Sequence, residues 1–285
     1  MHIKKISVAL SGGAAVGFGH IAVIQAFEDL GLTPYAISGT SMGALLGAAW
    51  AGGMTSQEII CYAEGLWNNK AALITKFWKL KSRQSKELFG KGNIIQFDAE
   101  DVLDIFMPPQ YPKNFDDLSI PFTAVASDYY NWNEIHFNKG EMKIAIAASI
   151  AIPAVFKPVA YKDTLLVDGG CVNPMPFDVL PGDSDIIVAA DILGGPRRNE
   201  KNEPPSPLNS VMGASSLFMQ SIINQKLKLK YPHILLRPSG RKFNAMDFHK
   251  FNEIIANAQP LREEAKMQLH RMVEVQNKRQ IEKEG

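Results

Sequence analysis

The chain has 285 residues, of which 46% are hydrophobic and 21% are charged, and its formal net charge is +1. These values are typical of a globular protein with a substantial core, and they argue against a nucleic-acid partner bound through a broad basic surface. The length and the lack of an internal repeat predict a single domain over residues 1–285. Cys61 and Cys171 match no zinc or redox spacing, so we expect reduced thiols in the core.

No targeting or membrane-spanning segment is predicted. The apolar run near the amino terminus is too short for a secretory signal. The most apolar window, residues 144–156, contains Pro153 and falls short of the ~20 residues that a spanning helix needs. We therefore expect a cytoplasmic protein.

Short strands and helices alternate in the first half of the chain. Apolar spacing and glycine turns predict, in chain order, a strand at 5–13, a helix at 20–31 capped by Gly31, a strand at 34–39, a helix at 41–53 and a helix that begins at a Thr55–Glu58 capping box. Residues from about 65 to 115 carry no strand pattern, which predicts a helical insertion over the sheet.

The second half continues this alternation. Further strands are predicted at 121–128, 134–138, 163–170, 185–192 and 233–239. The charged, proline-rich residues 196–207 predict a mobile loop, and Ser206 with Pro207 predicts the start of an amphipathic helix. A helical tail on the surface is predicted at 247–285. The pattern predicts a three-layer α/β/α sandwich with a mostly parallel central sheet, its core at about 5–193 plus 206–240.

Ser41 lies in the sequence Gly39-Thr40-Ser41-Met42-Gly43, between a predicted strand and a predicted helix. Acyl transfer to a serine needs an exposed hydroxyl, a base and donors for the oxyanion. In such a nucleophile elbow, the glycines on either side of the serine let neighbouring backbone pass closely, and the helix N-terminus favours negative charge. The alternative interpretation is that Ser41 only caps the helix.

The glycine-rich residues 11–20 follow the first predicted strand. Their amides, those of Gly13 and Ala14 especially, would converge near Ser41 if the first two strands are neighbours in the sheet. A nucleotide-binding loop is a weaker interpretation, because the Rossmann spacing, its later acidic residue and the Gly-Lys-Ser/Thr of a P-loop are all missing.

The candidate base is a carboxylate. His233, His249 and His270 are the histidines in the right chain order for a triad, and none lies in a glycine-marked loop at the end of a strand. Asp168, by contrast, ends an apolar strand immediately before Gly169 and Gly170, where catalytic loops of parallel sheets gather. An Asx turn is the alternative role for Asp168.

Three segments in this order, SGGAAVGFGHIAVI, GTSMG and VDGG, resemble the patatin-like phospholipase family, and the similarity extends over about residues 5–193. The resemblance implies a Ser-Asp dyad, with Ser41 as nucleophile and Asp168 as base, that hydrolyses acyl esters of phospholipids, lysophospholipids and related lipids without metal or cofactor. It also implies an oxyanion hole formed by Gly12, Gly13, Ala14, Ala15 and Gly17.

Two residues depart from the family pattern. Ala14 stands where the family commonly has a glycine, which would cost roughly 1–2 kcal/mol if the position needs a positive φ. Val16 stands where an arginine is common, and we expect weaker binding of an anionic headgroup or altered loop geometry. An acyltransferase or thioesterase on the same elbow, or a catalytically weak scaffold, remains an alternative.

Residues 76–91 carry six basic side chains against the single acid Glu87, with Phe77, Trp78 and Leu80 between them. This pattern is typical of a segment that rests on an anionic membrane surface. A helix with a solvated basic face is the alternative interpretation.

Overall fold

The computed structural model describes residues 4–68, 75, 96–195, 204–240 and 242–284. The basic segment at 76–91 lies outside the described residues, as does most of the loop predicted at 196–207.

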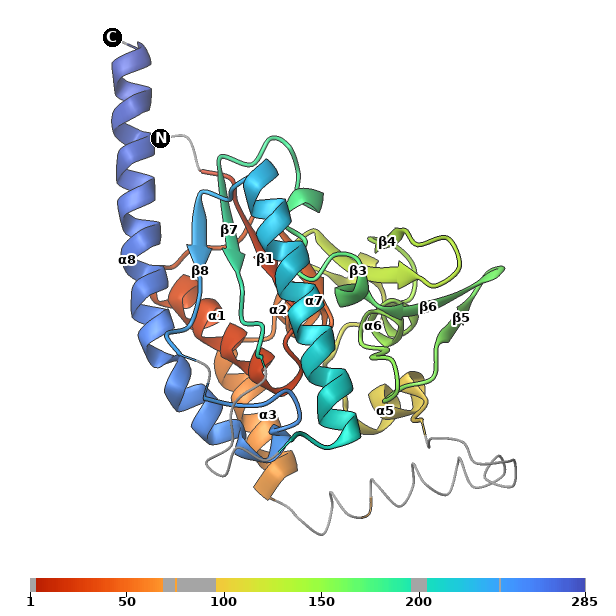
Figure 1. Ribbon diagram of the computed structural model, residues 1–285. Coiled ribbons are helices and arrows are strands. Elements are labelled where there is room, and N and C mark those ends of the chain that lie inside the picture. The colour runs from red at the N-terminus through yellow and green to blue at the C-terminus, as the bar shows by residue number, and fades with distance from the viewer. Residues whose placement is uncertain (1–3, 69–74, 76–95, 196–203, 241, 285) are drawn as a thin grey trace, which may run out of the picture.

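One sheet of eight strands runs through the molecule (Figure 1). The strands are β1 (Ile6–Leu10), β2 (Ala36–Thr40), β3 (Phe122–Asp128), β4 (Glu134–Phe137), β5 (Val159–Tyr161), β6 (Thr164–Asp168), β7 (Ile186–Ala190) and β8 (Ile234–Leu236). Their order is β5-β6-β3-β2-β1-β7-β8, and β4 also pairs with β3. The pairings among β3, β2, β1, β7 and β8 are parallel, whereas β4 and β6 run antiparallel to β3.

Helices cover both faces of this sheet. They are α1 (His20–Asp29), α2 (Met42–Ala51), α3 (Ser56–Asn68), α5 (Ala99–Phe106), α6 (Met142–Ser149), α7 (Pro207–Leu229) and α8 (Phe251–Glu284). In β1, Val8 and Leu10 belong to the core shared with α1, α2, α6 and α8, whereas Ala9 belongs to a smaller core with Ile223 of α7. Figure 1 shows α7 crossing one face of the sheet. The predicted α/β sandwich is confirmed.

Local sequence signals mark the helix ends. Gly31 has a φ of 61°, and the amides of Gly31 and Leu32 bond the carbonyls of Glu28 and Phe27, which closes α1 with a Schellman motif. The hydroxyl of Ser206 accepts a hydrogen bond from the Asn209 amide at 3.3 Å and caps α7.

The capping box at the start of α3 is formed in both directions. The Thr55 amide donates to the Glu58 carboxylate at 2.8 Å, and the Glu58 amide donates to the Thr55 hydroxyl at 3.2 Å. The two reciprocal bonds satisfy amides that would otherwise be left open at the helix start.

Other elements differ from the sequence expectations. The apolar window at 144–156 supplies most of α6, which packs on β3 and β6, and neither α6 nor β5 was predicted. The predicted surface tail, α8, buries one face through Phe251, Ile254 and Leu261. Cys61 and Cys171 are exposed rather than in the core, because one lies on the outer face of α3 and the other in the loop after β6.

Among the described residues, we find no helix that is both long and apolar enough to span a membrane. The most apolar helix segments instead serve the interior: in α6, Ala145, Ile146, Ala147 and Ala148 are all fully buried.

The crossing of α2 over β1 can be tested at Gly43. A Cβ atom there would lie 2.2 Å from the carbonyl oxygen of Leu10, so we expect Gly43→Ala to lower the free energy of unfolding by about 3 kcal/mol or to prevent folding. Gly65→Ala is the matched control, because a Cβ at this exposed position in α3 meets no atom within 4 Å. It should stabilise the protein by about 0.5–1 kcal/mol. Urea unfolding measures the free energy of unfolding of both variants. Equal changes in Gly43→Ala and Gly65→Ala would contradict a close approach of α2 to β1 at Gly43.

Candidate active site

Ser41 occupies a strained turn between β2 and α2. Its φ of 55° and ψ of −122° lie in a region that non-glycine residues rarely adopt. A Cβ at Gly39 would lie 2.4 Å from the Gly43 carbonyl oxygen, so the turn has no room for a side chain at this position. Ser41 holds the N-cap position of α2, but its side chain makes no capping hydrogen bond. The hydroxyl is therefore not used for capping.

Buried hydroxyl groups hold this turn in place. The Ser41 amide donates to the Ser149 hydroxyl at 2.9 Å, and that hydroxyl donates to the Val125 carbonyl at 2.6 Å. The Thr40 hydroxyl donates to the carbonyl of Asn173 at 2.7 Å. The elbow is thereby tied to β3, to the end of α6 and to the loop after Asp168. Ser149 was not identified from the sequence, although it is a polar residue in an otherwise apolar window.

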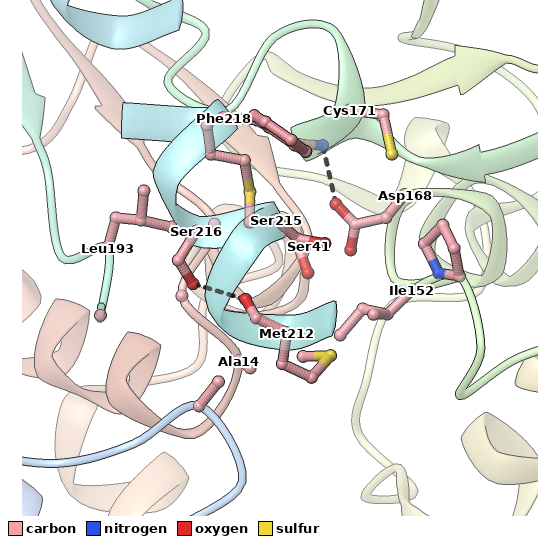
Figure 2. A pocket seen from close by; sticks show the side chains of 17 residues that line it. Ala14, Ser41, Ile152, Asp168, Cys171, Leu193, Met212, Ser215, Ser216 and Phe218 are labelled. Carbon is pink, nitrogen blue, oxygen red and sulfur yellow. Dashed lines mark hydrogen bonds between the residues drawn. The ribbon is translucent and has the colours of Figure 1, made fainter. Parts of the chain in front are cut away.

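Asp168 lies at the same height along β3 as Ser41, although its strand, β6, runs in the opposite direction to β2. Since β6 is antiparallel to β3, our expectation that Asp168 ends a parallel strand was wrong. Thr40 pairs with Val125 and Asp168 pairs with Ala126, so Ser41 and Asp168 flank β3 at one height. Figure 2 shows the Asp168 carboxyl group pointing toward Ser41.

The two oxygens of the Asp168 carboxyl group have different surroundings. Oδ1 accepts a hydrogen bond from the Gly170 amide at 2.7 Å, which is the Asx turn considered from the sequence. Oδ2 is buried and accepts no hydrogen bond of normal geometry from the described residues. Burial raises the pKa of Asp168 from 3.8 to about 6, while the Ser41 hydroxyl and the Gly170 amide act in the opposite direction. The turn thus uses one oxygen and leaves the other available.

The glycine-rich loop lies beside Ser41, because β1 and β2 are parallel neighbours with Leu10 paired to Gly39. A Cβ at Gly12 would lie 3.6 Å from the Cβ of Ser41. Among the described residues, the amides of Gly12 and Ala15 donate to the carbonyls of Pro174 and Ala245, each at 2.9 Å. These two amides are therefore engaged elsewhere, contrary to their expected place in the oxyanion hole.

Gly13 and Ala14 supply the remaining donors of the loop, since no hydrogen bond from either amide to a described residue is found. Gly17 belongs to the 3₁₀ turn Ala14–Gly19 and packs against Met42. Met42, directly after Ser41, starts α2, so its amide has no acceptor within the helix. Ala14 does have a positive φ, 46°, which for alanine costs roughly 1–2 kcal/mol.

His20 contacts the backbone at the start of this loop. Its ring is fully buried, and Nε2 lies 2.8 Å from the Ser11 carbonyl oxygen, which can only accept, so Nε2 carries the proton. Burial lowers the pKa of His20 to about 4, so the ring stays neutral at neutral pH. The sequence signal for this role was the position of His20 at the end of the glycine-rich residues 11–20.

No histidine in the described part of the chain lines the candidate site. The Nδ1 atom of His233 accepts the Ile187 amide at 2.9 Å near the amino ends of β7 and β8. His249 lies in a 3₁₀ turn before α8, and His270 lies on α8 beside Glu274.

Ser41 and Asp168 share a cavity of about 180 Å³ (Figure 2). Gly12, Gly13, Ala14 and Gly170 also line it, whereas Gly39, Gly43 and Gly169 do not line it and instead lie against neighbouring backbone. Its apolar lining comes chiefly from Ile152, Pro153, Leu193, Met212, Phe218 and Met219. The last three belong to α7, which therefore forms one wall.

Cys171 is a second possible nucleophile in the cavity wall. Although Cys171 as a whole residue is exposed, its thiol is partly desolvated in the cavity wall; this desolvation and the nearby Asp168 carboxylate raise its pKa to about 12, so it stays protonated. The described residues contain no group of histidine, cysteine and acidic side chains that could hold a metal ion.

Comparisons with known proteins identify the family of this chain. Residues 8–181 match the family described as patatin-like phospholipase. An uncharacterized NTE family protein of Mycobacterium tuberculosis is 33% identical over 220 residues, which cover 75% of this chain and 58% of the relative. Lysophospholipase nte1 of Aspergillus niger is 24% identical over 281 residues, covering 88% of this chain and 17% of the relative. The chain thus spans 58% of the length of its mycobacterial relative.

Among solved structures, human GIVD cytosolic phospholipase A2 superimposes with a TM-score of 0.48 at 13% identity, covering 95% of this chain and 60% of that chain. The family match covers more than half of the sequence and includes the glycine-rich loop, the serine elbow and Asp168. The chain belongs to the patatin-like phospholipase family.

Proposed function

We propose that this chain is a serine hydrolase that cleaves carboxylic ester bonds of phospholipids or lysophospholipids through a Ser41–Asp168 dyad and an acyl-enzyme. The observation that carries the proposal is a buried carboxyl oxygen without a normal hydrogen bond, in the same apolar cavity as a serine on a strained elbow. The relative named as a lysophospholipase supports the same substrate class.

In the first step, Asp168 Oδ2 takes the hydroxyl proton as Ser41 Oγ attacks the ester carbonyl carbon. The amides of Gly13 and Ala14 hold the oxyanion, with the Met42 amide as a third donor. Collapse of this intermediate breaks the ester bond, and the departing alcohol takes the proton from Asp168. Water then attacks the acyl-enzyme with the same carboxylate as base, which releases the fatty acid and restores the serine.

The pKa of Asp168 suits this role. At its ordinary value of 3.8 an aspartate is a weak base for a serine hydroxyl, whereas a value of about 6 is closer to neutral pH, where general-base help is most effective. No histidine among the described residues lines the cavity, so none of them offers a competing base there.

A fluorophosphonate probe should label Ser41 in the folded protein, and peptide mapping checks the position. Ser41→Ala should abolish labelling and ester hydrolysis. Asp168→Asn should lower kcat/KM by about 10²- to 10⁴-fold, because the general base is lost. His233→Ala is the control and should keep full activity. Loss of activity in His233→Ala would instead favour a histidine-dependent acyltransferase or thioesterase, and a folded protein that is never labelled would favour a scaffold.

The pH dependence of kcat/KM should show an acid limb centred near pH 6, since Asp168 must lose its proton to act as base. Activity should rise with pH through this value and then level off. Initial rates on a neutral short-chain ester, from pH 4 to 8, measure the limb. A midpoint near pH 4 would mean that the carboxylate is not buried in the active protein.

Asp168→Asn should also stabilise the fold at high pH. Because the folded pKa lies above 3.8, the folded state keeps a proton that the unfolded state has released, and stability falls as pH rises from about 4 to 6. The neutral amide removes this cost, so the free energy of unfolding should increase by up to about 3 kcal/mol at pH 8 and much less at pH 4. Urea unfolding at both values tests this. The exposed Asp163→Asn is the control, and the same gain there would contradict the explanation.

A further inference from the structure

A second cavity, of about 410 Å³, adjoins the first. Its side chains are of a different kind: six are polar or charged, namely Asp191, Gln220, Asn224, Arg237, Lys242 and Asn257. The cavity with Ser41 is lined chiefly by apolar groups. The two hollows therefore suit the two ends of an amphipathic molecule.

The same segments of chain form the boundary between the cavities. Leu193 and Gly194 line both. On α7, Met219 lines the first cavity and the next residue, Gln220, lines the second. The two cavities thus lie on either side of Leu193 and Gly194.

Arg237 directly follows β8, and its guanidinium is held through Nε while its side chain stays partly exposed. Its Nε donates to the Asp191 carboxylate at 2.9 Å, and Gln220 donates to the same oxygen at 3.3 Å. The Asp191 side chain is 3% exposed, whereas that of Arg237 is 44% exposed. The terminal nitrogens of Arg237 make no hydrogen bond to the described residues. A guanidinium fixed through Nε keeps two parallel donors for a phosphate or carboxylate.

The exposed end of Arg237 and the spacing of the strands both favour an anion in this cavity. The Arg237 side chain is 44% exposed, and its pairing with Asp191 uses only Nε. The sheet order places β8 three strands from β2, or about 14 Å at ordinary strand spacing. An arginine side chain and a glycerol linker together cover this separation between a reacting ester and a phosphate.

From these observations we infer that the second cavity is a subsite for the phosphoryl group of an acylglycerol phosphate, with the Arg237 terminal nitrogens as its main donors. This inference rests on the proposed function, because it places the ester of the same molecule at Ser41. Asp191 acts as a positioning residue: it holds the guanidinium and does not touch the ligand.

The test compares an acylglycerol phosphate with a monoacylglycerol of the same short acyl chain. Arg237→Gln should lower kcat/KM for the phosphate ester about tenfold to hundredfold, mainly through KM, and leave the neutral ester unchanged. Lys228→Gln removes the same charge from an exposed position on α7 outside both cavities, and it should leave the ratio of the two substrates unchanged. If Arg237→Gln loses kcat/KM equally on both esters, or on neither, the proposal of a phosphoryl subsite is wrong.

A double variant separates binding from folding. Arg237→Gln alone leaves the buried Asp191 carboxylate without its partner, whereas Asp191→Asn with Arg237→Gln removes both charges together. The double variant should show the same selective loss with ordinary thermal stability. If it regains the phosphate preference, Arg237 is not the donor. If the wild-type protein hydrolyses neither ester, the proposed function fails rather than the subsite.

Calorimetry with a non-hydrolysable ether analogue of the acylglycerol phosphate tests the subsite without turnover. Wild-type protein should bind this analogue about tenfold or more tightly than Arg237→Gln does. Inorganic phosphate and glycerol phosphate should bind much more weakly than the analogue, because they lack the acyl chain. If they bind as tightly, the cavity is a site for free phosphate and the lipid assignment is wrong.

Discussion

The backbone strain at Ser41 is the constraint on which the rest of the site depends. A serine with this φ and ψ persists only where its surroundings hold it, and here buried hydroxyl groups do so from several elements. Ser38 and Thr40 bond the carbonyls of Pro176 and Asn173, so the strand that carries the nucleophile is fastened to the chain that follows Asp168. The nucleophile and the carboxylate are therefore positioned by one network.

The site also combines features that each oppose stability. Ala14 is left-handed, Ser41 is strained and Asp168 is a buried carboxyl group. Such features persist when the remaining packing compensates for them, and here they lie at the ends of β1, β2 and β6, next to the two hydrophobic cores. The strain thus lies where the chemistry is proposed, and the surrounding elements are regular.

Local patterns in the sequence predicted much of the fold and part of the site. The strand-turn-helix around Ser41, the Asp168-Gly169 turn and the cap at Ser206 depend on neighbouring residues, so spacing alone indicates them. The direction of β6 and the partners of Ser149 depend on contacts between distant segments. Val16 shows the same limit, because local sequence does not reveal that it lines one cavity together with Arg237, which directly follows β8.

The small size of the cavity at Ser41 has a consequence for long fatty acids. Its 180 Å³ is below the ~300–1,000 Å³ that small-molecule sites usually offer, so only the carbons nearest the ester fit inside. Under the proposed function, the remainder of a long tail lies outside this cavity, whose wall includes Phe218, 69% exposed. Such a site would discriminate branching or unsaturation close to the carboxyl end of the acyl chain, and not differences near its methyl end.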